Sequence, residues 1–279
     1  MGNMKPSLQS SLNAKILGSG ERTLILSNGF GSNQAIWQYI LPHLLQNHRV
    51  VVYDMVGCGH VDPKLYDEEI YSSLEAFSDD LLSLLEELGV QNCVFLGHSM
   101  SGMIGCFAAI KRPEIFQSLI LLGASPRYLN SEGYEGGFER SELESLFKSM
   151  ESDYTAWTET FAPYVLGSED PILVRGFSDS LKSMKPEIAV SILKTVFLSD
   201  CRDILPKLKV PCVLIQTRVD RAVPMFVAEY LKRELGGKAS LEVLDVEGHV
   251  PHVTAPSLLI SALDTVLPHA YGEAEALVL

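Results

Sequence analysis

Long apolar runs are missing from this sequence of 279 residues, and positively charged residues are scarce. No stretch approaches the roughly 20 uninterrupted apolar residues of a membrane-spanning helix, and the first residues lack the apolar core of a signal peptide. Lys and Arg number 22 against 35 Asp and Glu, so the formal net charge is -13. A nucleic-acid binder needs a basic face to neutralise phosphates, and anionic lipid attracts the same face. We therefore expect neither a nucleic acid nor a membrane as a partner.

Paired cysteine motifs are missing as well. The cysteines are five, widely spaced and without a CxxC pair: Cys58, Cys93, Cys106, Cys201 and Cys212. An odd number of cysteines within mostly apolar surroundings predicts buried, reduced thiols in a cytosolic compartment. No dinucleotide fingerprint follows an expected strand, and no set of three metal ligands is present. We expect no cofactor and no metal.

Apolar runs that suit buried parallel strands alternate with helical patterns, which predicts an α/β fold with a mostly parallel sheet flanked by helices. The expected strands are residues 23–27, 50–53, 93–96, 119–122, 213–216 and 241–244. The expected helices of this sheet are residues 74–88, 99–111, 224–235 and about 256–267, and residues 270–279 suggest a loosely held tail. One α/β domain accommodates all of these elements.

Residues from about 128 to 199 contain no convincing strand. Helical patterns, broken by Gly and Pro, cover residues 140–151, 154–164, 171–184 and 186–198. The sequence therefore predicts a core made of residues 1–127 and 200–279, with an all-helical lid, residues 128–199, inserted between strands. Such an insert over the carboxyl edge of a parallel sheet is well placed to cover a ligand crevice.

Residues 97–101, Gly-His-Ser-Met-Ser, predict a nucleophile elbow, because they follow an expected strand and open an expected helix. A serine hydroxyl attacks only when a base removes its proton and when it stands clear of the backbone. Ser101 replaces the last Gly of the general G-x-S-x-G pattern, and Gly102 follows at once. The alternative, a chance Gly-x-Ser in a turn, is disfavoured by the flanking elements. Ser99 is the candidate nucleophile.

Residues 28–31, Asn-Gly-Phe-Gly, follow the first expected strand. We expect an oxyanion hole there, formed by the backbone N–H groups of Phe30 and Met100. Removing one such donor typically lowers the rate by ~10²–10³.

Asp220 is the candidate acid and His249 the candidate base. Asp220 follows the expected strand 213–216 and precedes a helix, which places its carboxylate at the edge of the sheet. His249 follows Gly248 after the last expected strand. Together with Ser99 these residues give the chain order Ser, Asp, His that this fold uses.

Competing residues have simpler interpretations. Asp200, Asp203 and Asp245 are expected to cap a helix or a turn. His252, three residues after the candidate base, is the alternative histidine, and His98 is expected to pack into the sheet.

From about residue 11 to about residue 267, the chain resembles the plant karrikin and strigolactone receptors, a family of α/β-hydrolases with a bacterial stress regulator as a relative. The residues that carry the resemblance are 28–31 with Gln34 and Trp37, 97–101, 124–128 (Ala-Ser-Pro-Arg-Tyr), 136–138 (Gly-Gly-Phe), 161–163 (Phe-Ala-Pro), 199–200 (Ser-Asp) and 220–224 (Asp-Arg-Ala-Val-Pro). Serine after the elbow, as at Ser101, is usual in this family. Asn28 replaces the usual His, and Cys58, Gly102 and Arg221 also differ, which suggests a divergent, duplicated member.

The resemblance implies a ligand pocket between core and lid. By matched position its residues are Phe30, Met100, Tyr128, Phe138, Leu146, Trp157, Phe161, Phe197, Ala222 and Val223. Tyr128 is closer to the karrikin branch than to the strigolactone branch. The alternative for these aromatic residues is ordinary core packing.

The resemblance also implies what the protein does. Members bind butenolides, some hydrolyse strigolactones slowly, and the ligand-altered lid recruits an F-box protein and a repressor that is ubiquitinated. A monomer in the cytoplasm and nucleus is expected.

Three functions remain open from the sequence. The first is a butenolide receptor with slow hydrolysis of an ester or enol ether, and the second is an ordinary metabolic carboxylesterase. The third is a binding module with a vestigial triad. Epoxide hydrolases and dehalogenases are excluded, since they need Asp where this chain has Ser99.

Overall fold

A seven-stranded sheet in the order β1-β3-β2-β4-β5-β6-β7 forms the centre of the computed structural model, which describes residues 7–272. The strands are β1 (Lys15–Leu17), β2 (Arg22–Ser27), β3 (His48–Val52), β4 (Cys93–His98), β5 (Phe116–Leu122), β6 (Cys212–Val219) and β7 (Ala239–Glu247). β1 runs antiparallel to β3, and the other neighbouring pairs are parallel. The predicted mostly parallel sheet is confirmed. β1 was not predicted, because three largely exposed residues carry no apolar pattern.

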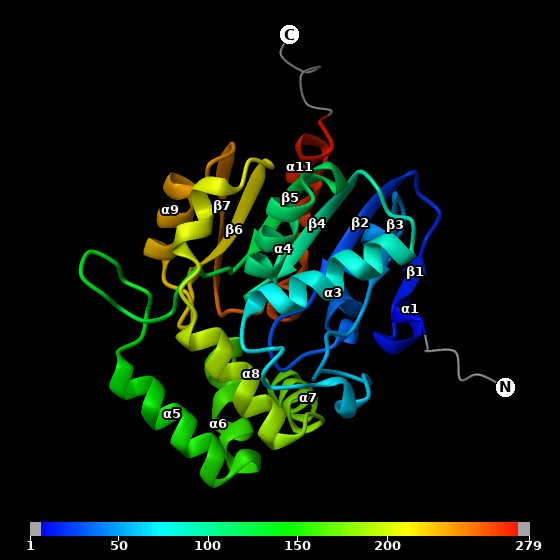
Figure 1. Ribbon diagram of the computed structural model, residues 1–279. Helices are drawn as coiled ribbons and strands as arrows, with labels where there is room; N and C mark the ends of the chain where they lie inside the picture. The colour runs from blue at the N-terminus through cyan, green and yellow to red at the C-terminus, as the bar shows by residue number, and fades with distance from the viewer. Residues whose placement is uncertain (1–6, 273–279) are drawn as a thin grey trace, which may run out of the picture.

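The sheet is covered on both faces, so its central strands are apolar on both sides. In β2, Leu24 and Leu26 are buried in one apolar cluster, whereas Ile25 belongs to the other. This alternation follows from the two-residue repeat of a strand. Figure 1 shows α3 (Leu74–Glu87) and α4 (Met100–Lys111) on one face and α11 (Pro256–Ala270) on the other.

Further elements lie before, between and after the strands. They are α1 (Leu8–Ser11), α2 (Leu41–Leu44), α9 (Met225–Glu234) and α10 (Pro251–Thr254), with the 3-10 helices η1 (Gln34–Tyr39), η2 (Pro63–Leu65), η3 (Pro113–Ile115) and η4 (Arg202–Lys207). Within residues 7–272, no helix has the length and apolarity to cross a bilayer.

Four helices lie between β5 and β6, and Figure 1 shows them gathered at one end of the sheet. They are α5 (Arg140–Ser152), α6 (Tyr154–Leu166), α7 (Pro171–Lys182) and α8 (Pro186–Leu198), and we call them the lid. Local chemistry sets their limits. The Asp153 carboxylate accepts from the first turn of α6 at 3.0 Å, and Gly167 ends α6 in a left-handed conformation (φ 59°). Pro171 begins α7 directly after Asp170, which caps it.

The expectation of a loose tail is wrong for its first residues. Ala270 ends α11, and Tyr271 is buried. The Tyr271 hydroxyl donates to the Thr23 carbonyl at 3.1 Å, which fixes the end of α11 to β2. The remainder of the expected tail, residues 273–279, lies outside the described residues.

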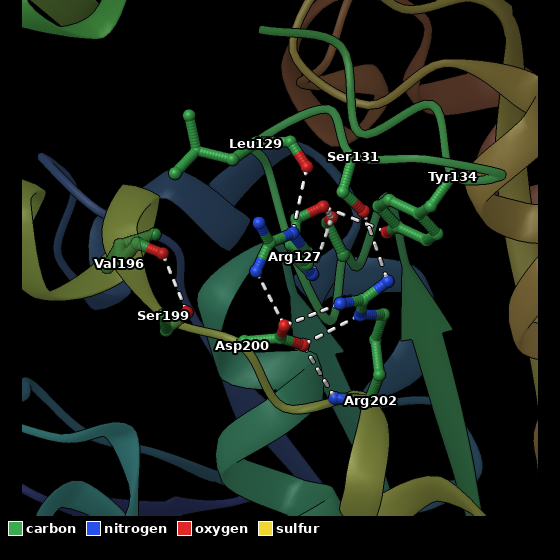
Figure 2. A network of polar contacts seen from close by, with 9 residues as sticks. Arg127, Leu129, Ser131, Tyr134, Val196, Ser199, Asp200 and Arg202 are labelled. Carbon is green, nitrogen blue, oxygen red and sulfur yellow. Dashed lines mark hydrogen bonds and ion pairs between the residues drawn. The ribbon is translucent and has the colours of Figure 1, made fainter. Parts of the chain in front are cut away.

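The two crossings between core and lid lie side by side at Arg127 and Asp200, which form an antiparallel bridge. The Asp200 carboxylate accepts from Arg127 at 2.5 Å and from Nε and Nη2 of Arg202 at 2.8 and 2.7 Å (Figure 2). The Tyr134 ring lies under Arg202, with its centroid 4.9 Å from the guanidinium carbon, and its hydroxyl donates to the Arg127 carbonyl. A single carboxylate therefore ties both ends of the lid together.

Asp200→Asn should loosen this connection. Burial raises the pKa of the Asp200 carboxyl, but hydrogen bonds from Arg202 and the charges of Arg202 and Arg127 lower it below its ordinary value of 3.8. A lowered pKa means that the stabilisation is present at neutral pH and is lost as the pH falls through the folded-state pKa. We expect a melting temperature lower by about 2–4 °C at pH 7, the effect of roughly 1 kcal/mol. This difference should shrink below pH 3.8.

Asp203→Asn is the matched control, because the Asp203 ion pair with Lys207 is exposed and lies within one turn of η4. It should leave the melting temperature unchanged. Equal shifts in the two variants at pH 7 would contradict the role given to Asp200.

Candidate active site

Ser99 lies at a sharp turn between β4 and α4. Its backbone has a positive φ (φ 56°, ψ -123°), a conformation that costs a non-Gly residue of order 1–3 kcal/mol. Its neighbours must be small, because a Cβ at Gly97 would lie 2.5 Å from the Ser101 carbonyl, and one at Gly102 would lie 2.4 Å from the Cβ of Ala124. The strained turn lifts the Ser99 hydroxyl above the carboxyl edge of the sheet, as an elbow requires.

Three side chains from separate segments form one hydrogen-bonded chain. His249 Nε2 lies 2.9 Å from Ser99 Oγ, and His249 Nδ1 lies 2.7 Å from Asp220 Oδ2. All three residues are buried. The geometry places a nucleophile, a base and an orienting acid within hydrogen-bond reach of one another.

The environment of Asp220 favours its ionised form. Burial by itself raises the pKa of this carboxyl, but His249 and the N–H groups of Ala222 and Val223 lower it below its ordinary value. These N–H groups donate to Asp220 Oδ1 at 2.8 and 3.0 Å. The Gln216 amide also donates to Asp220 Oδ2 at 3.2 Å. Gln216 was missed from the sequence, because a polar residue within a strand has no motif of its own.

The competing residues lie elsewhere. Asp245 pairs with Arg218 at 2.5 Å, and Asp200 and Asp203 pair with basic residues in or next to η4. His252 is fully buried and stacks on Trp37, with ring centroids 4.5 Å apart.

The expectation that His98 only packs is incomplete. Burial and the neighbouring His249 lower the pKa of His98 to about 3, so the ring is neutral. A carbonyl can only accept, hence His98 Nε2 donates to the His249 carbonyl at 2.8 Å. His98 thus fixes the backbone of the candidate base.

The expected oxyanion donors lie on either side of Ser99. Met100 is the first residue of α4, and Phe30 lies in the turn after β2, beside Gly31 with its positive φ of 75°. Within residues 7–272, neither N–H group donates to another segment. Both are therefore available to a developing oxyanion.

A cavity of about 30 Å³ lies over Ser99. It is lined by Phe30, His98, Ser99, Tyr128, Phe161, Val165, Phe177, Leu193, Val196, Phe197, Ala222 and His249. The Tyr128 hydroxyl lies 3.4 Å from Ser99 Oγ, and burial raises its pKa, so it carries its proton. Apart from Ser99, Tyr128 and the two histidines, the walls are apolar, which suits an uncharged ligand.

The pocket expected from the resemblance is only partly the observed one. Phe138, Leu146, Trp157, Val223 and Met100 are not among the lining residues. Two of the expected rings lie behind rings that line the cavity. The Phe138 ring packs edge-on against Phe197, with ring centroids 5.2 Å apart, and the Trp157 ring stacks on Phe161, with centroids 4.5 Å apart. Val165 and Phe177 were missed, as were Leu193 and Val196, for which apolar spacing in α8 is the only signal.

No set of three or more His, Cys, Asp or Glu side chains in the described chain is arranged to hold a metal ion. The five cysteines are buried and free.

Comparisons with known proteins agree with this geometry. The family model described as the alpha/beta hydrolase fold matches residues 22–256. The chain belongs to the α/β-hydrolase family. It is 47% identical over 258 residues to strigolactone esterase D14 of Arabidopsis thaliana, and the match covers 92% of this chain and 97% of that protein. It is 44% identical over 257 residues to karrikin insensitive 2 receptor CA of Petunia hybrida, over 92% of this chain and 95% of the relative.

A solved hydrolase from Oleispira antarctica has the same fold, with a TM-score of 0.90 and 31% identity over 93% of this chain and 96% of that one. The predicted membership of the karrikin and strigolactone receptor family is confirmed, as is the hydrolase class. The identities to the two named branches are close, so they do not assign this hydrolase to either.

Ser101 links the oxyanion loop of this hydrolase to α4. Its hydroxyl donates to the Asn28 carbonyl at 2.5 Å and accepts from Ser27 Oγ at 2.9 Å. Because the Ser27 hydroxyl donates its only proton to Ser101, the Tyr53 hydroxyl must donate to Ser27 Oγ at 2.7 Å. The buried chain from Tyr53 to the Asn28 carbonyl gives Ser101 a role that Gly could not fill.

The lid also contacts the base. The backbone N–H of His249 donates to the Val165 carbonyl of α6 at 2.8 Å. A Cβ at Gly248 would lie 2.1 Å from the Leu166 carbonyl, and the φ of 106° further restricts this position to Gly. The end of α6 and the loop that carries His249 therefore share one closely fitted contact.

Ser101→Ala should lower both stability and kcat. It leaves the Asn28 carbonyl and the Ser27 hydroxyl buried without their partner, so we expect the free energy of unfolding to fall by about 1–3 kcal/mol. A looser oxyanion loop should lower kcat about tenfold, less than the ~10²–10³ for loss of a donor. Denaturant unfolding and steady-state hydrolysis of a simple ester measure the two effects.

Ser118→Ala is the matched control, since the buried Ser118 hydroxyl has no hydrogen-bond partner within the described chain. Similar values of kcat and stability for the two variants would remove the role assigned to Ser101.

Proposed function

We propose that this hydrolase is a butenolide receptor that retains slow Ser-His-Asp hydrolysis of an ester or enol ether. The observation that carries the proposal is the hydrogen-bonded chain of Ser99, His249 and Asp220 beneath an apolar, lid-covered cavity. The names of the relatives, a strigolactone esterase and a karrikin receptor, support the ligand class.

Attack on an ester begins when Ser99 Oγ bonds to the carbonyl carbon and its proton passes to His249 Nε2, 2.9 Å away. The Asp220 carboxylate, 2.7 Å from Nδ1, holds the tautomer whose Nε2 is free to accept and stabilises the imidazolium that forms. The N–H groups of Phe30 and Met100 stabilise the negative charge on the former carbonyl oxygen.

Release follows from the same groups. The His249 imidazolium returns its proton to the leaving oxygen, the C–O bond breaks and an acyl-enzyme remains on Ser99. Water then attacks the acyl carbon while His249 removes a proton, and Ser99 leaves reprotonated. The closed lid excludes bulk water, which favours slow deacylation.

Signalling depends on the lid. A cavity of about 30 Å³ holds roughly two water molecules, whereas an engineered cavity that binds benzene has a volume of about 150 Å³. A butenolide therefore has to displace lid side chains when it binds, and the altered lid is the surface that recruits an F-box protein and a repressor. We place the monomeric receptor in the cytoplasm and nucleus.

Butenolides of both mirror-image forms test this function. We expect slow hydrolysis of some of them, accompanied by a fall in the melting temperature as the lid opens. Hydrolysis rates and thermal shifts are measured on the same panel. Fast hydrolysis of many simple esters without a thermal response would instead indicate an ordinary metabolic carboxylesterase.

Ser99→Ala separates chemistry from binding. Loss of a triad nucleophile lowers kcat by roughly 10⁶, so hydrolysis should disappear while the thermal response to butenolides remains. Binding with no turnover in the unaltered chain would indicate a vestigial triad. Full activity in the variant would exclude Ser99 as the nucleophile.

A further inference from the structure

A second and larger hollow lies at the surface, between the lid and the core. It has a volume of about 470 Å³ and runs between α7 on one wall and η1, the Gly59–His60 turn and Val253 on the other. Two large apolar side chains line it and remain exposed, Ile172 at 77% and Tyr39 at 44%. We call this hollow the outer groove.

Phe177 of α7 separates the outer groove from the cavity over Ser99. Among the described residues it is the one that lines both spaces. Its side chain is buried, with 7% exposed, so it fills the boundary between them. Phe177 is therefore the side chain through which the two spaces adjoin.

The sizes of the two spaces indicate what such a connection is for. The cavity of about 30 Å³ has room for the reacting carbonyl but little else, since it is about one fifth of an engineered cavity of about 150 Å³ that binds benzene. The outer groove is large enough for the rest of a small ester. Its exposed Ile172 and Tyr39 offer apolar contact, as do Ala35, Ile36, Leu173 and Val253. Apart from Phe177, the remaining side chains of the lining are polar (Asn33, Gln38, His60, Asp179, Ser180 and Ser183), and the carboxylate of Asp179 disfavours an anion.

We propose that the outer groove binds the apolar part of the substrate ester that extends beyond the catalytic cavity, and that Phe177 is the gate between the two. This inference rests on the proposed function, since it assumes that an ester reacts at Ser99. It assigns substrate-length selectivity to α7.

Gly176 provides a direct way to block the groove. It lines the groove, and a Cβ built there meets no atom within 4 Å, so a side chain at this position extends into open space. Gly176→Trp should therefore fill the groove without strain in the lid. Arg175→Trp is the matched control: Arg175 is 85% exposed on the same helix and does not line the groove.

Three esters report on the groove: methyl acetate, methyl octanoate and octyl acetate, with acid release followed by titration at constant pH. Gly176→Trp should lower kcat/KM for at least one long ester about tenfold relative to methyl acetate. The ester that responds shows whether the acyl or the alcohol side occupies the groove. Arg175→Trp should leave the ratios unchanged. Equal effects of Gly176→Trp on all three esters, or the same ratio change in Arg175→Trp, would overturn the proposal.

Phe177→Leu tests the gate with a side chain that still packs in the boundary. It should raise kcat/KM for the long ester relative to methyl acetate, and an unchanged or lowered ratio would overturn the gate. Ser99→Ala separates this outcome from the proposed function. If Ser99→Ala still hydrolyses all three esters, the assigned chemistry fails. If Ser99→Ala is inactive and Gly176→Trp shows no dependence on ester length, the role of the outer groove is contradicted, whereas Ser99 remains the nucleophile.

Discussion

The hydrogen bonds of His249 join every part of this molecule that function requires. Its side chain connects Asp220 after β6 with Ser99 after β4. Its backbone N–H is bound by the Val165 carbonyl of the lid, and its backbone carbonyl by His98. A histidine fixed at four points cannot turn away from the nucleophile, but it also cannot remain in place if the end of α6 moves.

This arrangement makes the lid a part of the active site rather than a cover over it. The two ends of the lid meet at Asp200, whose carboxylate holds Arg127 and Arg202 together. A lid that is anchored at its ends can rearrange only by shifting its helices or its side chains. Such shifts would reach His249 through Val165, so a ligand that moves α6 would also change the position of the base, and the coupling would act in both directions.

The sequence was sufficient to predict that the side chains of Ser99, Asp220 and His249 meet, because its signals are local and ordered along the chain. Ser99, Asp220 and His249 each follow an apolar strand, and parallel strands bring their carboxyl ends to one edge. The pocket was harder, since it depends on how helices pack against one another. Phe138 and Trp157 occupy positions that match pocket residues, yet in this chain other rings cover them. Nothing in the apolar spacing of α7 distinguishes Phe177 from an ordinary core residue.

The two halves of the lid differ in their connection to the base. α6 contacts the His249 loop directly through the Val165 carbonyl. α7 borders the outer groove instead. It contacts α6 through a hydrogen bond in which the Tyr154 hydroxyl of α6 donates to the Leu181 carbonyl of α7 at 2.6 Å. In the proposed gate, a side-chain movement at Phe177 would admit substrate without breaking a hydrogen bond of His249. A movement of α6 would break the bond from His249 N–H to the Val165 carbonyl. Substrate entry along α7 and a ligand-induced shift of α6 would let one small lid serve both hydrolysis and partner recognition. The shift of α6 would follow when a bound ligand is too large to be accommodated by movement of Phe177 alone.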